Sequence, residues 1–258
     1  MGTQNVIALA KAKGARLLHI STISVSGNSF DHDPAFPETV FNETSLYIGQ
    51  PLENVYVRSK FEAEVAVLRA RLEGLEAAVI RVGNLANRRS DAKFQENYSE
   101  NATLTKLKAL VNLGIFPEQM EDYPLEFSPV DETAAAVIRL AQHFDERYSV
   151  FHAYNHQRIP FSRFVAALPS AGLECCSVSA QEFMQAVQMP GVEQVRKAFI
   201  NDIDRGGQLN LQSKIVVHSD FTTWRLSQTG FAWKTIDDAY LTAYTNHFKN
   251  IGYWEAGK

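Results

Sequence analysis

Tyr56-Val57-Arg58-Ser59-Lys60 is the stretch of sequence that decides the fold and the chemistry of this chain. A phenol and an ammonium group four residues apart lie on one face of a helix. The segment upstream, Leu17-Leu18-His19-Ile20-Ser21-Thr22, is an apolar run that ends in two hydroxyl residues. Reduction of a carbonyl needs a proton donor and a second hydrogen-bond donor at the oxygen that receives charge, and a nearby ammonium ion helps a phenol to exchange protons. We therefore predict that Thr22, Tyr56 and Lys60 form a catalytic set.

The spacing of Tyr56 and Lys60 is weak support by itself, because such a pair is also common on an ordinary helix surface. The surrounding pattern strengthens the prediction. A strand over 16–20 runs into the hydroxyl residues, a long polar loop covers 28–50, and a helix over 52–72 then presents the pair. Long loops inside compact domains are usually functional.

Strands and helices alternate along the first part of the chain, which predicts an α/β fold with a parallel sheet and helical crossovers. Beyond Pro160 helices dominate, so the tail is predicted to be a small, mostly helical subdomain. We expect helices at 2–13, 52–72, 101–113, 132–143, 162–168, 180–188, 192–202 and 236–251, and strands at 16–20, 76–82 and 150–154. The sheet domain would comprise 1–90 and 126–158, and the helical subdomain 91–125 and 159–258.

Two further motifs follow predicted elements. Gly83-Asn84-Leu85 comes directly after the second strand, where ligands of open parallel sheets bind, although a plain turn also needs a glycine. Gly230-Phe231-Ala232-Trp233 places two aromatic residues around a turn, and such a pair is more often part of a core than of a ligand cage.

Composition and charge exclude several classes of function. The net charge of -4 provides no basic field for nucleic acid, and no apolar run approaches the roughly 20 residues that a membrane helix needs. Cys175 and Cys176 are adjacent and lack the spaced Cys or His partners of a zinc site, and the histidines are scattered, so we expect no metal. Two unpaired thiols suit the reducing cytoplasm.

Taken together, the motifs resemble one family, the thioester reductase domains that end nonribosomal peptide synthetases. These are of the extended short-chain dehydrogenase/reductase type and are related to carboxylic acid reductases and fatty acyl-CoA reductases. The segments that carry the resemblance occur in the family's order: Gly2-Thr3-Gln4-Asn5-Val6, Ser21-Thr22-Ile23-Ser24-Val25, Tyr56-Val57-Arg58-Ser59-Lys60, Arg81-Val82-Gly83-Asn84-Leu85, Ser128-Pro129-Val130-Asp131, Leu226-Ser227-Gln228-Thr229-Gly230-Phe231-Ala232-Trp233, Tyr240-Leu241 and Tyr244.

This resemblance implies a function and a set of roles. It implies a Rossmann-like sheet with a helical substrate-binding subdomain, and the NADPH-dependent release of an acyl or peptidyl chain from a carrier protein's phosphopantetheinyl thioester as an aldehyde or alcohol. Thr22 and Tyr56 would bind the carbonyl oxygen, and Tyr56 would donate the proton. NADPH would contact Ser21, Tyr56, Lys60, Gly83, Asn84 and Leu85. The loop over 28–50 and the helical tail would shape the substrate channel.

One departure from the family pattern is plain in the sequence. The glycine-rich turn that holds the pyrophosphate of the cofactor would precede these motifs, and the chain contains no Gly-x-Gly. Three explanations remain: a truncated form of a working enzyme, which we favour, one half of a split protein completed by a partner, or a non-functional remnant. The missing N-terminal segment, or synthetase modules in the same polypeptide, would then be partners. We expect this chain alone to bind NADPH weakly and to be inactive.

Two other functions stay open from the sequence. The same hydroxyl, tyrosine and lysine serve other extended short-chain enzymes, such as nucleotide-sugar epimerases and dehydratases. A non-catalytic module that binds carrier proteins is the alternative from another class.

Overall fold

A parallel sheet is the centre of the first of two units in this computed structural model, which describes residues 2–27, 39–199, 209, 211, 213 and 215–254. Unit 1 comprises Met1–Leu85, Asp131–His156 and Ser213–Lys234. Unit 2 comprises Ala86–Val130, Gln157–Gln212 and Thr235–Lys258.

Unit 1 contains the three strands predicted from the sequence, and all of them are parallel, in the order β1-β3-β8. Its elements are α1 (Gly2–Lys13), β1 (Leu17–Thr22), the short 3-10 helix η1 (Ile23–Ser26), β2 (Thr39–Phe41), α2 (Val55–Leu72), β3 (Ala77–Val82), α4 (Val130–Gln142), β8 (Val150–Ala153), β11 (Ile215–Val217) and α8 (Asp220–Ser227). The prediction of an α/β fold with a parallel sheet is confirmed.

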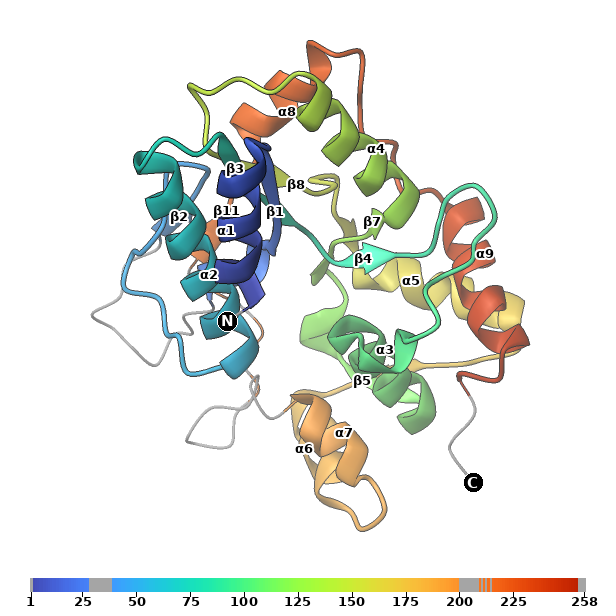
Figure 1. Ribbon diagram of the computed structural model, residues 1–258. Coiled ribbons are helices and arrows are strands. Elements are labelled where there is room, and N and C mark those ends of the chain that lie inside the picture. The colour runs from blue at the N-terminus through green and yellow to red at the C-terminus, as the bar shows by residue number, and fades with distance from the viewer. Residues whose placement is uncertain are drawn as a thin grey trace. The chain divides into compact units, whose positions relative to one another are not determined.

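Helices cover both faces of this sheet. Figure 1 shows α1 and α2 together beside the strands, and residues of both helices pack on Ala77 and Val79 of β3. On the opposite face α4 and α8 pack on Ala78 and Ile80. All six residues of β3 are therefore buried, as expected for the central strand of a parallel sheet. Trp233 joins this second core, which confirms that it has a packing role.

The buried side of α2 differs from the one that its apolar residues predict. The apolar pattern favours Phe61, Ala63, Val65 and Leu68 as the core face. Of these, Leu68 packs against the core while partly buried, but the buried residues of α2 are Glu64, Val67 and Ala70. A carboxylate is tolerated in this position because it is paired inside the protein, as described below.

The division of the chain also differs from the one that the sequence predicts. The predicted helical subdomain includes residues 213–234, whereas in the structure they belong to unit 1. There β11 pairs in parallel with β2, and α8 packs against β8. The Thr222 hydroxyl accepts a hydrogen bond from the backbone N–H of His152.

Unit 2 is mostly helical and has an aromatic core. Its elements are η2 (Tyr98–Glu100), α3 (Ala102–Leu113), β5 (Ile115–Pro117), η3 (Glu118–Met120), β6 (Pro124–Leu125), β7 (Ser128–Pro129), β9 (Ile159–Pro160), α5 (Phe161–Ala167), η4 (Leu168–Ala171), β10 (Cys176–Val178), α6 (Ala180–Gln188), α7 (Glu193–Phe199) and α9 (Asp238–Asn250). In the two-residue strand β4 (Leu85–Ala86) the chain passes from unit 1 into unit 2. Phe248 of α9 meets Tyr244 and Trp254 at ring-centroid distances of 5.0 and 5.6 Å.

Two predicted segments extend beyond the described residues. The loop predicted over 28–50 is described from 39 onward, and the helix predicted over 192–202 is described as α7 up to Phe199. Within the described ranges, every helix is too short or too polar to cross a membrane.

Candidate active site

The hydroxyl of Thr22 lies at the carboxyl end of β1, where the strand turns into η1. Thr22 caps this short helix: its Oγ1 accepts the backbone N–H of Ser24 at 3.1 Å. The same oxygen donates to the Ser24 Oγ, also at 3.1 Å, and the Ser24 side chain is exposed. The cap thus fixes the position of the threonine hydroxyl at the end of the strand.

The turn after η1 packs against Gln50, near the end of the loop that follows it. Gly27 has a φ of 65°, and a Cβ there would lie 3.0 Å from the Gln50 Cβ, so only glycine fits without a shift. The buried Gln50 amide donates to the carbonyl oxygens of Val25 and Leu46 at 3.0 Å each.

The first turns of α2 carry Tyr56 and Lys60, and the Lys60 side chain reaches the end of β1. Asn54 caps the helix by accepting the backbone N–H groups of Tyr56 and Val57, which explains why α2 begins at Val55 and not at residue 52. Tyr56 is 54% exposed. The Lys60 Nζ donates to the carbonyl oxygen of Ile20 at 3.2 Å.

Among the described strands β1 lies at the edge of the sheet, and this contact is on its side away from β3. The backbone N–H of Leu17 donates to the carbonyl oxygen of Glu76, the residue before β3. In a parallel strand the backbone N–H and C=O groups of alternate residues point to the same side. The N–H and C=O groups of Leu18, Ile20 and Thr22 therefore point away from β3. Lys60 supplies a partner to one of these carbonyl groups, two residues before Thr22.

The Gly83-Asn84 turn lies at the same edge of the sheet. Thr22 and Val82 are register partners in β1 and β3, so the turn begins directly beside the end of β1. Asn84 is exposed, and Leu85 opens β4. The structure thus brings Thr22, Lys60 and this turn to the carboxyl ends of two neighbouring strands, and it leaves Tyr56 accessible from solvent.

Ser21 points to the other face of β1 and is buried. The family resemblance predicts a cofactor contact for this residue, and in the structure its hydroxyl donates to Glu64 Oε1 at 2.5 Å. The same carboxylate is paired with Arg81: Nη2 donates to Oε2 at 2.7 Å and Nε donates to both oxygens at 3.1 Å. Both charged side chains are 0% exposed.

His152 completes this buried cluster on the third strand. Its Nδ1 lies 2.6 Å from the carbonyl oxygen of His218, which can only accept, so Nδ1 carries the proton and Nε2 accepts from Arg81 Nη1 at 3.0 Å. Burial, and then the guanidinium of Arg81, lower the pKa of His152 to about 3. The Phe41 ring stacks on the imidazole and lies 4.7 Å from the Arg81 guanidinium carbon.

Little in the amino-acid pattern points to this cluster. Glu64 falls in a helix of mixed composition, and Arg81 lies seventeen residues away in an otherwise apolar strand. A charge inside an apolar strand was the one available sign, because such a group is buried only when it is paired.

His19 shares the face of β1 that carries Ser21. Burial, and then the nearby ammonium of Lys60, lower the pKa of His19, while the Glu64 carboxylate acts in the opposite direction. The imidazole is therefore neutral near pH 7.

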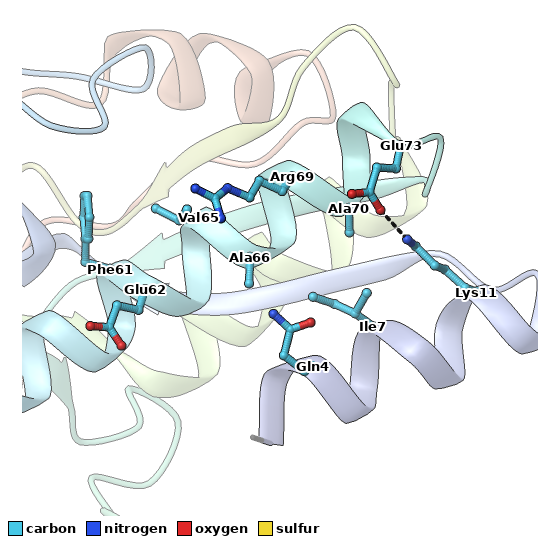
Figure 2. Close-up of a pocket in the computed structure, with 10 residues that line it drawn as sticks. All are labelled: Gln4, Ile7, Lys11, Phe61, Glu62, Val65, Ala66, Arg69, Ala70 and Glu73. Atoms are coloured by element: carbon cyan, nitrogen blue, oxygen red, sulfur yellow. Dashed lines mark hydrogen bonds and ion pairs between the residues drawn. The ribbon is translucent and has the colours of Figure 1, made fainter.

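A pocket of about 420 Å³ lies between α1 and α2 (Figure 2). Its floor is apolar, through Ile7, Val65, Ala66 and Ala70, and the Lys11–Glu73 ion pair closes one end at 2.6 Å. The residues that line it do not include those predicted for catalysis or cofactor binding.

The fold and the motifs define an NAD-binding α/β protein. The family model described as male sterility protein, an NAD-binding family, matches residues 1–137. The chain belongs to this family.

Particular relatives narrow the resemblance. A thiolation-reductase di-domain of an archaeal nonribosomal peptide synthetase is 33% identical, with a TM-score of 0.83 over 98% of this chain and 53% of that one. The reductase domain of the aureusimine biosynthetic cluster is 29% identical, with a TM-score of 0.81 over 97% of this chain and 64% of that one. A linear gramicidin synthase of Brevibacillus parabrevis is 25% identical over 98% of this chain, which spans 5% of that protein. The chain thus spans less than two thirds of each of these relatives, and the resemblance to synthetase reductase domains is confirmed.

Proposed function

We propose that this chain forms the catalytic part of an NADPH-dependent reductase that releases an acyl or peptidyl chain from a carrier-protein thioester as an aldehyde or alcohol. The observation that carries the proposal is the convergence of Thr22, Lys60 and the Gly83-Asn84 turn at the carboxyl ends of β1 and β3, where open parallel sheets bind ligands. Similarity to synthetase reductase domains supports this choice of reaction.

The available donor groups fit the nicotinamide end of such a cofactor. An ammonium group and a phenol can bond ribose hydroxyls, and a glycine beside the exposed Asn84 has no side chain to block the approach of a flat ring. Lys60 and Tyr56 would hold the ribose, and Gly83, Asn84 and Leu85 would border the nicotinamide. When it is bound, NADPH supplies a hydride.

The side chains of this protein would bind and protonate the carbonyl oxygen of the substrate. Tyr56 would donate a proton to this oxygen, and Thr22 would donate a second hydrogen bond as negative charge develops there. The hydroxyl of Thr22 already has an alternative acceptor in Ser24, so substrate binding would exchange one partner for another. Lys60 would favour the ionised form of the phenol that remains after the transfer.

The substrate class is supported by the archaeal relative, in which a reductase domain is joined to a thiolation domain of a nonribosomal peptide synthetase. We infer that the partner is a phosphopantetheinyl carrier protein that presents its acyl thioester to this edge of the sheet.

The direct test is reduction of an acyl thioester on a purified carrier protein by the protein that contains this chain. We expect oxidation of NADPH, measured by loss of absorbance, and an aldehyde or alcohol in the mass spectrum. NADH and a nucleotide sugar serve as comparison reactants. Turnover of the nucleotide sugar without any release from the carrier would contradict the proposal.

A further inference from the structure

A polar row crosses the sheet at the level of the candidate site. Ser21 and Arg81 are register partners in β1 and β3, and Arg81 and His152 are partners in β3 and β8. Side chains of register partners in parallel strands lie on one face, and here this is the face covered by α2. Glu64 enters the row from α2 and is bonded to Ser21 and Arg81.

Glu64 also lies on the same stripe of α2 as two of the predicted catalytic residues. Tyr56, Lys60 and Glu64 are four residues apart in turn, so they follow one line along the helix over about 12 Å. Exposure decreases along this line: Tyr56 is exposed, Lys60 is half-buried and Glu64 is fully buried.

Each of the last two residues on this line bonds β1 at a neighbouring position. Lys60 bonds the backbone of Ile20, and Glu64 bonds the side chain of Ser21. The first contact is made by a long, half-exposed side chain, whereas the second is buried and is reinforced by Arg81. The Glu64 contact is therefore the firmer of the two, and together with the packing of Val67 and Ala70 it joins α2 to the sheet.

We propose that Glu64 is a positioning residue, held by Ser21 and Arg81, that fixes α2 so that Lys60 stays at the edge of β1 beside Thr22. This inference rests on the proposed reductase function for its kinetic consequence, and its geometric consequence is independent of that function. It also assigns the Ser21 hydroxyl to the interior of the protein and not to the cofactor.

The test uses Ser21→Ala, which removes the hydroxyl and keeps the ion pair, and Glu64→Gln, which keeps the shape and removes the charge. Ser21→Thr is the conservative variant that retains a hydroxyl. Val79→Ala is the matched control, because Val79 is buried on the same face of β3, two residues before Arg81, and packs in the apolar core. All variants are compared in buffer where each is folded.

Two readouts separate a role in positioning Lys60 from a general loss of protein stability. The first is kcat against KM: we expect kcat to fall by about tenfold in Ser21→Ala and by more in Glu64→Gln, with KM for NADPH changed less than about twofold. The second is the rate at which an amine-reactive reagent labels Lys60, measured by peptide mass spectrometry against Lys13. We expect it to rise in both variants, to recover in Ser21→Thr, and to stay unchanged in Val79→Ala.

Each outcome decides the inference. A raised KM for NADPH with unchanged kcat in Ser21→Ala would mean that the hydroxyl meets the cofactor, and would overturn it. Unchanged kcat and unchanged labelling of Lys60 would overturn it as well. The kinetic readout uses the protein that contains this chain. If the wild-type form of that protein reduces no thioester but the labelling of Lys60 rises as expected in the variants, the proposed function fails and the positioning role stands. If Glu64→Gln does not fold, Ser21→Ala carries the test.

Discussion

The Glu64 carboxylate and the Arg81 guanidinium form an ion pair of 2.7 Å whose two side chains are completely buried between α2 and β3. Removing charges from water is costly, and this pair offsets the cost with further hydrogen bonds to Ser21 and to the carbonyl oxygen of Ser45. We therefore expect the pair to specify how the helix sits on the sheet more than to add net stability.

Loss of one partner of this ion pair should lower the free energy of unfolding far more than loss of both. Arg81→Met alone leaves a buried carboxylate without its cation, and we expect the free energy of unfolding to fall by about 3–5 kcal/mol. Arg81→Met combined with Glu64→Leu should lose less than the single variant. Urea unfolding of the wild type, of each single variant and of the double variant measures this. A double variant whose loss equals the sum of two single losses would contradict the coupling.

Stability should fall in mild acid because of His152. Its pKa is about 3 when folded and 6.5 when free, so below pH 6.5 the unfolded chain binds the proton first, and stability is lost until the pH reaches about 3. Between pH 7 and pH 5 this amounts to about 2 kcal/mol. Burial lowers the pKa of His19 too, so its effect has the same sign.

Urea unfolding at the two pH values, repeated with His152→Gln, isolates this contribution. Glutamine can donate and accept in place of the imidazole but does not titrate. We expect the variant to lose about 2 kcal/mol less than the wild type between pH 7 and pH 5. An identical pH dependence in both proteins would exclude His152 as the cause.

The two adjacent cysteines should react very differently. Cys176 is exposed, whereas Cys175 is buried and donates to the carbonyl oxygen of Leu110. Burial, and then the neighbouring Cys176, raise the pKa of Cys175 to about 12, so little thiolate forms there at pH 8. A thiol reagent should label one cysteine in the folded protein and two in urea. In Cys176→Ser the fast reaction should disappear.

Thr22 should contribute both to stability and to turnover. Thr22→Val keeps the shape but removes the cap of η1, which should lower the free energy of unfolding by about 1 kcal/mol. It should also lower kcat by about 10²-fold through loss of a donor to the carbonyl oxygen. Thr22→Ser retains the hydroxyl and should restore most of both. Normal turnover in folded Thr22→Val would remove Thr22 from the catalytic set.

The sequence predicted those elements of unit 1 that a short stretch of neighbouring residues is enough to recognise. The apolar run through Ile20, the alternation of strand and helix, and the spacing of Tyr56 and Lys60 need only a few neighbouring residues to be recognised. The paired strands β2 and β11 did not emerge from the sequence, because three residues are too few to show a period of two and their partner is more than 170 residues away. The assignment of residues 213–234 to unit 1 depends on that pairing and on Thr222.

The residue types of the candidate site could be proposed from the sequence, whereas the buried contacts around them could not. Tyr56, Lys60 and Thr22 stand out because a phenol, an ammonium group and a hydroxyl suit proton transfer at a carbonyl oxygen. The buried pair of Glu64 and Arg81 links α2 to β3 through tertiary contacts. Helix periodicity did not indicate that Glu64 lies on the core face of α2, because a buried carboxylate is stable only with a partner, and the partner lies outside the local sequence.

The most direct test of the central claim is the kcat for thioester-dependent NADPH oxidation in Tyr56→Phe, with Tyr47→Phe as the matched loss of an exposed phenol that meets the Phe61 ring of α2. We predict that Tyr56→Phe lowers kcat by about 10²-fold or more, as expected for loss of a general acid, and that Tyr47→Phe stays within about twofold of wild type. Equal turnover in Tyr56→Phe and the wild type would contradict the account.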